Sequence, residues 1–83
     1  MRKRGIEMKK LMVNGKMVTT NIGSDYHLCD GDDKPTMDMV LVGIHESDRE
    51  ALERCVNRGY TRVTFYEVTT AVKGLHHRVI YAK

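Results

Sequence analysis

The chain has 83 residues, a formal net charge of +3 and two cysteines. A chain of this length forms one small domain, near the lower limit at which a single apolar core suffices. It contains no run of eighteen apolar residues that could cross a membrane, and no apolar N-terminal region typical of a signal peptide. We therefore expect a small cytoplasmic protein without a membrane partner, and leave a homodimer open.

Charged residues divide the chain into three blocks. Residues 1–16 carry six basic side chains and one acidic one, residues 17–53 carry two basic and nine acidic ones, and residues 54–83 carry six basic and one acidic one. Such blocks either form an ordinary solvated surface or steer a partner of opposite charge.

The N-terminal residues 1–7 are basic, polar and without hydrophobic periodicity, and we expect them to form a disordered tail. A single α+β domain then spans residues 8–83. The codons for Arg4 and Gly5 can form a purine-rich stretch that resembles a bacterial ribosome-binding site at the usual distance before Met8. Met8 is therefore an alternative start of translation, in which case the tail has no role.

The first expected element is a β-hairpin in residues 8–22. Asn14-Gly15 lies between two short apolar and β-branched runs, and this dipeptide favours a two-residue type I′ turn. The predicted cross-strand pairs are Val13 with Lys16, Met12 with Met17, and Leu11 with Val18.

Residues 23–36 follow as a long irregular connection, rich in Gly, Asp and Ser, which is either functional or mobile. This segment contains residue types that bind metals, namely His27, Cys29, Asp30, Asp32 and Asp33. Their spacing fits neither an EF-hand loop nor a four-ligand zinc site. We therefore expect no metal and no cofactor.

A strand and a helix are predicted next. Residues 37–44 are almost continuously apolar, which predicts a central strand covered on both faces. Residues 47–59 predict a short helix that begins with a capping box of Ser47 and Glu50 and ends at Gly59. The helix must pack on the sheet through its apolar stripe, which consists of Ala51, Leu52, Cys55 and Val56.

Residues 61–70 and 75–81 predict two further strands joined by a four-residue turn. The fold class that follows is a small single α+β domain of order β-β-β-α-β-β, with one helix packed on a mixed, mostly antiparallel sheet. A strand, helix and strand in succession make the third and fourth strands parallel, or nearly neighbouring. In the last hairpin the predicted pairs are Glu67 with Arg78, Tyr66 with Val79, Phe65 with Ile80, and Thr64 with Tyr81.

No pattern typical of a catalytic site is present, so we expect no enzyme activity. The sequence lacks the P-loop, G-x-G-x-x-G and G-x-S-x-G motifs. Cys29 and His27 have no third group to orient them, and the adjacent His76 and His77 point to opposite faces of a strand. Free thiols are expected in the cytosol, although a disulfide between Cys29 and Cys55 is left open.

The first of two candidate functions is a non-catalytic domain that binds a protein partner. Binding through an acidic loop and helix face, or through a strand edge, would provide specificity and contact area. In general terms such a chain resembles the small accessory or inhibitory proteins of bacteriophages and mobile elements. The candidate acidic residues are Asp25, Asp30, Asp32, Asp33 and Asp38.

The alternative function is nucleic-acid binding. Basic side chains neutralise phosphates and tyrosines stack on unpaired bases. The candidate residues are Arg54, Arg58, Arg62, Arg78 and Tyr66. No known nucleic-acid-binding motif accompanies them, and the competing interpretation is that the arginines are solvated and the tyrosines belong to the core.

Overall fold

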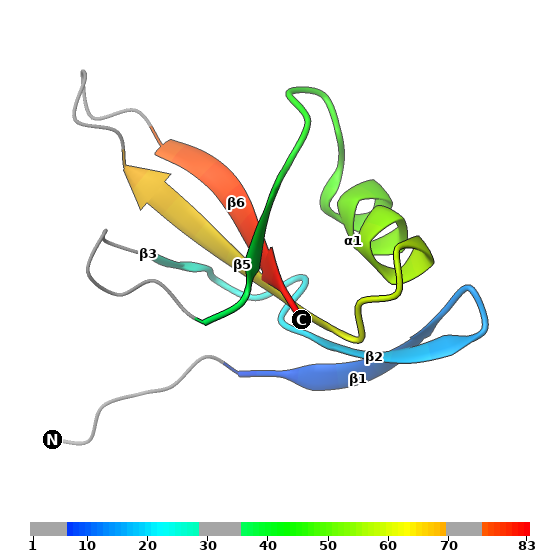
Figure 1. The fold of residues 1–83 in the computed structure, drawn as a ribbon. Helices are drawn as coiled ribbons and strands as arrows, with labels where there is room; N and C mark the ends of the chain where they lie inside the picture. The colour runs from blue at the N-terminus through cyan, green and yellow to red at the C-terminus, as the bar shows by residue number, and fades with distance from the viewer. Residues whose placement is uncertain (1–6, 29–35, 70–75) are drawn as a thin grey trace, which may run out of the picture.

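The structure is a computed structural model that describes residues 7–28, 36–69 and 76–83. The predicted α+β class is confirmed, and Figure 1 shows the helix on one side of the sheet. A two-residue strand within the predicted long connection is additional. In chain order the elements are β1 (Lys9–Val13), β2 (Lys16–Thr20), β3 (His27–Leu28), β4 (Asp38–Leu41), α1 (Asp48–Asn57), β5 (Arg62–Thr69) and β6 (His76–Ala82).

The strands form one mixed sheet in the order β1-β2-β5-β6-β4, with β3 also paired to β5. The β1–β2, β5–β6 and β4–β6 pairs are antiparallel, whereas β2 and β3 run parallel to β5. Every cross-strand pair predicted for the two hairpins is confirmed. At the first turn, Asn14 and Gly15 both have positive φ, as a type I′ turn requires.

The predicted central position of residues 37–44 is wrong. β4 is the outer strand of the described sheet and pairs with β6 alone, while β6 lies between β4 and β5. Val40 is buried, but Met39 and Leu41 on the other face are exposed. The apolar run predicted that a strand forms here but not its position in the sheet. The order of strands in space depends on which hairpin inserts beside which strand. The predicted parallel relation to β5 holds, with β6 between the two.

The helix α1 begins and ends as predicted. Ser47 accepts a hydrogen bond from the Glu50 amide at 3.1 Å, and Glu50 accepts one from the Ser47 amide at 2.9 Å. Gly59 has a φ of 101°, a conformation that glycine adopts at little cost. No helix within the described ranges is long and apolar enough to cross a membrane.

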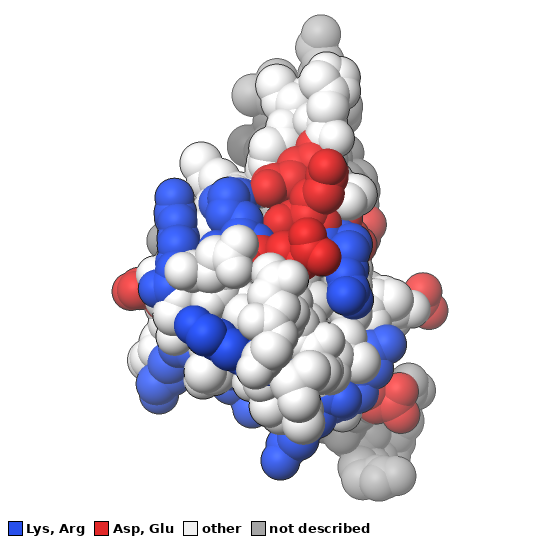
Figure 2. Space-filling view, turned by 90° about the vertical axis from the view of Figure 1, so that its right-hand side faces the viewer, with Lys and Arg blue, Asp and Glu red and all other residues white. Residues whose placement is uncertain are grey.

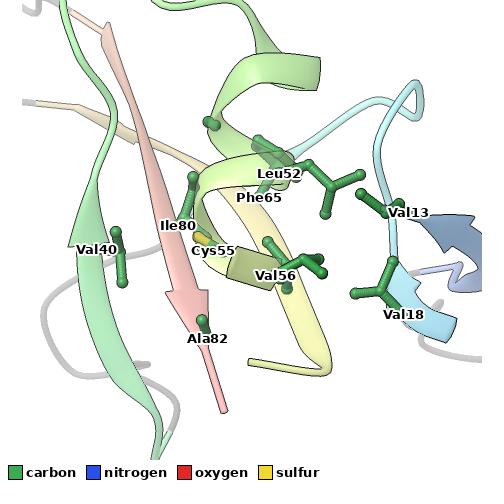
Figure 3. Close-up of a cluster of buried hydrophobic side chains, with 11 residues drawn as sticks. Val13, Val18, Val40, Leu52, Cys55, Val56, Phe65, Ile80 and Ala82 are labelled. Carbon is green, nitrogen blue, oxygen red and sulfur yellow. The ribbon is translucent and has the colours of Figure 1, made fainter. Parts of the chain in front are cut away.

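The main core lies between α1 and one face of the sheet. Figure 3 shows Leu52, Cys55 and Val56 of the helix directed at side chains of the central strands. Phe65 and Ile80 are fully buried beneath the helix. Side chains alternate between faces along a strand, so the intervening residues of β5 and β6 lie on the opposite face, where Val79 and Tyr81 form a smaller cluster.

Asn21 lies between two strands that pair with the same neighbour and not with each other. β2 ends at Thr20 and β3 begins at His27, yet both pair with β5. Between them the Asn21 side chain donates to the Phe65 carbonyl at 3.0 Å and accepts from the Phe65 amide at 2.7 Å. The buried side-chain amide thereby satisfies both backbone groups that a neighbouring strand would otherwise satisfy.

Candidate functional site

Exposed apolar side chains are concentrated on β4 and in the turn that follows it. Among the described residues, the most exposed large apolar side chains are Met12 (60%), Met17 (52%), Met39 (56%), Leu41 (69%) and Ile44 (91%). Met39 and Leu41 belong to β4, and Ile44 lies three residues beyond its end. The other two pair with each other across the first hairpin. Clustered exposure of this kind is typical of a binding surface.

The two outer strands of the described sheet differ in their protection. β1 carries exposed Lys9 and Lys10, and lysines on an edge strand disfavour pairing with another chain. β4 has a single charged residue, Asp38, at its first position. β4 is therefore the edge that is better suited to pairing with a partner.

Residues 41–46, which we call the Ile44 turn, connect β4 to the helix. The Glu46 amide donates to the Gly43 carbonyl at 3.2 Å, and the Gly43 amide donates to Glu46 Oε1 at 2.9 Å. These two bonds close the turn on itself. Ile44 is consequently held at the tip of an ordered turn.

Arg54 of α1 anchors the Ile44 turn to the helix. Its Nε and Nη2 donate to the two carboxylate oxygens of Glu46, both at 2.8 Å, and Nη2 also donates to the Leu41 carbonyl at 2.7 Å. The Arg54 guanidinium and the Gly43 amide lower the pKa of Glu46 from 4.5 to about 2, and the carboxylate raises the pKa of Arg54. Because a bidentate pair fixes orientation as well as distance, both ends of the turn are held.

Residues of the turn and the helix line a shallow hollow of about 690 Å³ that is largely open to solvent and has a mixed lining. Its apolar side is formed by Leu41, Val42 and Ile44, and its polar side by Glu46, Glu50 and Arg54. Figure 2, which faces the α1 side of the molecule, shows acidic side chains gathered in one patch with basic side chains on both sides. Three carboxylates in or next to the helix, those of Glu46, Asp48 and Glu53, form ion pairs with arginines of the chain.

A second network anchors the start of α1 to the sheet. Arg78 of β6 forms an ion pair with Asp48 and donates to the Glu46 carbonyl at 2.6 Å. Asp48 also accepts a hydrogen bond from the Tyr26 hydroxyl. Tyr26 stacks on Phe65 with ring centroids 5.3 Å apart, and its burial raises the pKa of its hydroxyl. Asp48 thus connects the start of α1 to β6 and to the Tyr26 ring stacked on the core.

The structure describes two of the five candidate acidic residues. Asp25 and Asp38 are exposed, and Asp38 accepts a hydrogen bond from the Tyr60 hydroxyl at 3.0 Å, which raises the pKa of Tyr60. The remaining candidates, Asp30, Asp32 and Asp33, lie outside the described residues.

The basic candidates are separated by the fold. Arg54 and Arg78 are bound to carboxylates on the helix side. Arg58 is the exposed C-cap of α1, and Arg62 begins β5 with its side chain exposed. Tyr66 packs edge-on against Tyr81 with centroids 5.4 Å apart. These residues therefore do not form one surface.

The described residues provide few groups that could act in catalysis or bind a metal. Cys55 is a buried free thiol, and burial raises its pKa, so it is a poor nucleophile. Residues 7–28, 36–69 and 76–83 contain no group of three His, Cys, Asp or Glu side chains placed to hold a metal. Cys29 lies outside these ranges. His76 and His77 are the first two residues of β6.

Comparison with protein-family models, with curated proteins and with solved structures finds no match to this chain. The Ile44 turn was missed at the level of sequence because its apolar residues continue a run that predicts burial. A weak signal was present in Gly43 and Glu46, a turn former and a carboxylate, just before the capping box.

Proposed function

We propose that the chain is a small non-catalytic domain that binds a protein partner through the outer side of β4 and the Ile44 turn. The observation that carries this proposal is the 91% exposure of Ile44 on a turn that Arg54 and Glu46 hold in place. An apolar side chain on an ordered turn loses little conformational freedom on binding, so more of its burial energy contributes to affinity. Leu41 and Met39 would extend the contact along the strand edge.

A role in the cytoplasm as an accessory or inhibitory protein of a bacteriophage or mobile element belongs to the same proposal. It extends the general resemblance that the sequence suggests, and the sequence lacks the P-loop, G-x-G-x-x-G and G-x-S-x-G motifs. The partner would be a host protein with an apolar pocket or an open strand edge that fits Ile44 and Leu41.

The test is an affinity capture with protein tagged at its C-terminus, followed by titration of the captured partner. We expect Ile44→Ser to weaken binding at least about tenfold, which corresponds to about 1.4 kcal/mol. The control is Met12→Ser, an exposed apolar position (60% against 91% for Ile44) on β1, at the opposite edge of the sheet. Unchanged affinity of the Ile44 variant would refute the proposed surface.

A second arm tests the acidic loop as the alternative contact. Reversing Asp30, Asp32 and Asp33 to Lys changes the charge of that segment by six units while leaving the Ile44 turn intact. Loss of the partner in this variant alone would move the contact from β4 to the loop. Loss in the Ile44 variant alone supports the proposal.

Nucleic-acid binding is retained as a second candidate because the strand registers align three basic residues. Lys10 pairs with Thr19, Thr19 pairs with Arg62, and Arg62 exchanges backbone hydrogen bonds with Lys83. Their neighbours Leu11, Val63 and Ala82 all face the helix, so alternation places this row on the opposite face. A row of cations across neighbouring strands could neutralise the phosphates of a single strand.

Binding of a labelled single-stranded oligonucleotide across a salt series tests this candidate. If it is correct, affinity falls as salt rises, with a slope of about 0.7 per phosphate neutralised, and Arg62→Glu weakens it. Arg49→Glu is the control, because Arg49 is an exposed basic residue of α1 outside the row. Absence of binding at low salt would exclude this function.

A further inference from the structure

We infer that the outer edge of β4 pairs antiparallel with β4 of a second copy, about a two-fold axis that passes through Val40. The two sheets would then join into one continuous sheet. This inference rests on the proposed binding role of the β4 edge, and it names a second copy of the chain as an occupant.

The register follows from the faces of the β4 side chains. Val40 lies in the core on the helix side, and Met39 and Leu41 lie on the opposite face. Directly opposed residues in a sheet share a face, and a slip of one residue exchanges the faces. A two-fold axis perpendicular to the sheet keeps the helix side of both copies on the same side. The axis must therefore pass through a residue, which then opposes the same residue of the second copy.

Only one of these registers opposes apolar side chains at all three positions from Met39 to Leu41. Centring on Val40 opposes the two Val40 residues and places Met39 of each copy against Leu41 of the other. Centring on Met39 would place the Asp38 carboxylate against Val40, where it would lose hydration beside the core. Centring on Leu41 would require residues 42 and 43 to continue the strand, but β4 ends at Leu41.

The joined edge would extend apolar contacts on both faces. Figure 3 shows Val40 on the strand outside Ile80, at the margin of the core. Opposed Val40 residues would therefore connect the two helix-side cores. On the other face Met39 is paired with Tyr81 and Leu41 with Val79, so the added Leu41 and Met39 of the second copy would continue these rows.

The charge distribution permits this pairing. Asp38 is the single charged residue of β4, and in the Val40-centred register it opposes Val42 of the second copy, one residue beyond the end of β4, so that it lies outside the paired segment from Met39 to Leu41. The two Asp38 residues are then four positions apart, or ~13 Å along the strand. At physiological salt this separation exceeds the ~8 Å screening length, so their repulsion is small. The lysines of β1 provide no comparable edge.

The dimer should be weak. A four-residue strand edge with three apolar side chains falls well short of the ~800 Å² per partner that stable complexes bury. We therefore expect dissociation in the micromolar range or above, which leaves the edge available to a tighter-binding partner.

Sedimentation equilibrium of the untagged chain from ~10 µM to ~1 mM tests the inference. We expect the average mass to rise toward that of a dimer with concentration. Leu41→Lys should remain monomeric throughout, because two lysines would enter the joined edge, whereas Met12→Lys on β1 should behave as the unmodified chain. Circular dichroism of each variant confirms folding. A chain that is monomeric at every concentration, or an equal effect of Met12→Lys, would overturn the inference.

Cysteine crosslinking tests the register. In a Cys29→Ser background, a mixture of Met39→Cys and Leu41→Cys chains should form an intermolecular disulfide faster than either chain does by itself. Faster self-crosslinking of Met39→Cys or of Leu41→Cys would overturn the Val40-centred register.

The two proposals fail separately. A monomeric chain whose partner binding still depends on Ile44 would refute self-pairing and leave the proposed function standing. A dimer whose captured partner is insensitive to Ile44→Ser would refute the proposed function.

Discussion

Arg54 donates two hydrogen bonds of 2.8 Å to the two carboxylate oxygens of Glu46, a residue eight positions earlier in the chain. This pair fixes the exit of β4 and the entry to α1 at the same time, because Arg54 also binds the Leu41 carbonyl. The exposed Ile44 lies between these two anchors. The Arg54 guanidinium therefore adds to the two hydrogen bonds between Gly43 and Glu46 that close the turn.

The first prediction concerns acid. The pKa of Glu46 lies at about 2 in the folded chain, below its ordinary value of 4.5, so its charged form stabilises the fold. The stabilisation is complete above about pH 5 and is lost as the pH falls toward 2. Glu46→Gln should lower the free energy of unfolding by about 1 kcal/mol at pH 7, and the difference from the unmodified chain should shrink in acid.

Urea denaturation at pH 7 and at pH 3 measures this difference. The matched control is Glu53→Gln, which removes the more exposed Arg49–Glu53 pair on the same helix and should cost less than about 0.5 kcal/mol. If Glu46→Gln lowers the free energy of unfolding by the same amount at both pH values, the charged Glu46 carboxylate does not stabilise the fold.

The second prediction concerns the start of α1. Ser47→Ala removes the acceptor for the Glu50 amide and half of the capping box. We expect a loss of about 1 kcal/mol in the free energy of unfolding, measured by denaturation. Ser47→Asp keeps an acceptor at the same place and should retain most of the stability. Equal losses in the two variants would show that the cap contributes little.

The third prediction concerns Asn21, which is fully buried. Asn21→Leu keeps the approximate volume but leaves the amide and the carbonyl of Phe65 without partners. Each unsatisfied buried group costs about 1–3 kcal/mol, so the variant should be strongly destabilised or unfolded. Thr19→Ala, at a half-buried position on β2, is the control and should lose much less. Comparable thermal midpoints for the two variants would disprove the bridging role.

The fourth prediction concerns Arg78 and Asp48, which join β6 to the helix start. Arg78→Met should lower the free energy of unfolding by about 1–2 kcal/mol, because Asp48 loses its ion-pair partner in a half-buried site. A double-mutant cycle with Asp48→Asn measures the coupling between the two side chains. Additive losses would mean that the pair contributes no interaction energy of its own.

Local signals determined much of the fold. Asn14-Gly15 fixed the first hairpin because both residues tolerate positive φ, and the turn length then set the register. Ser47, Glu50 and Gly59 determined the ends of α1 because capping bonds form between residues close in sequence. The opposite charges of Glu67 and Arg78 likewise predicted the pair that these residues form between β5 and β6.

The tertiary structure decided the rest. Nothing local in residues 37–44 states that β6 inserts between β4 and β5, and that insertion leaves Leu41 and Met39 on an outer strand. The bond between Asn21 and Phe65 joins residues 44 positions apart, and periodicity carries no information about such a contact. Sequence by itself therefore determined the elements and their nearest pairings. Which edge remains open, and which arginine is available to a partner, follow only from packing, because strand order and side-chain pairing across the core depend on distant residues meeting in space.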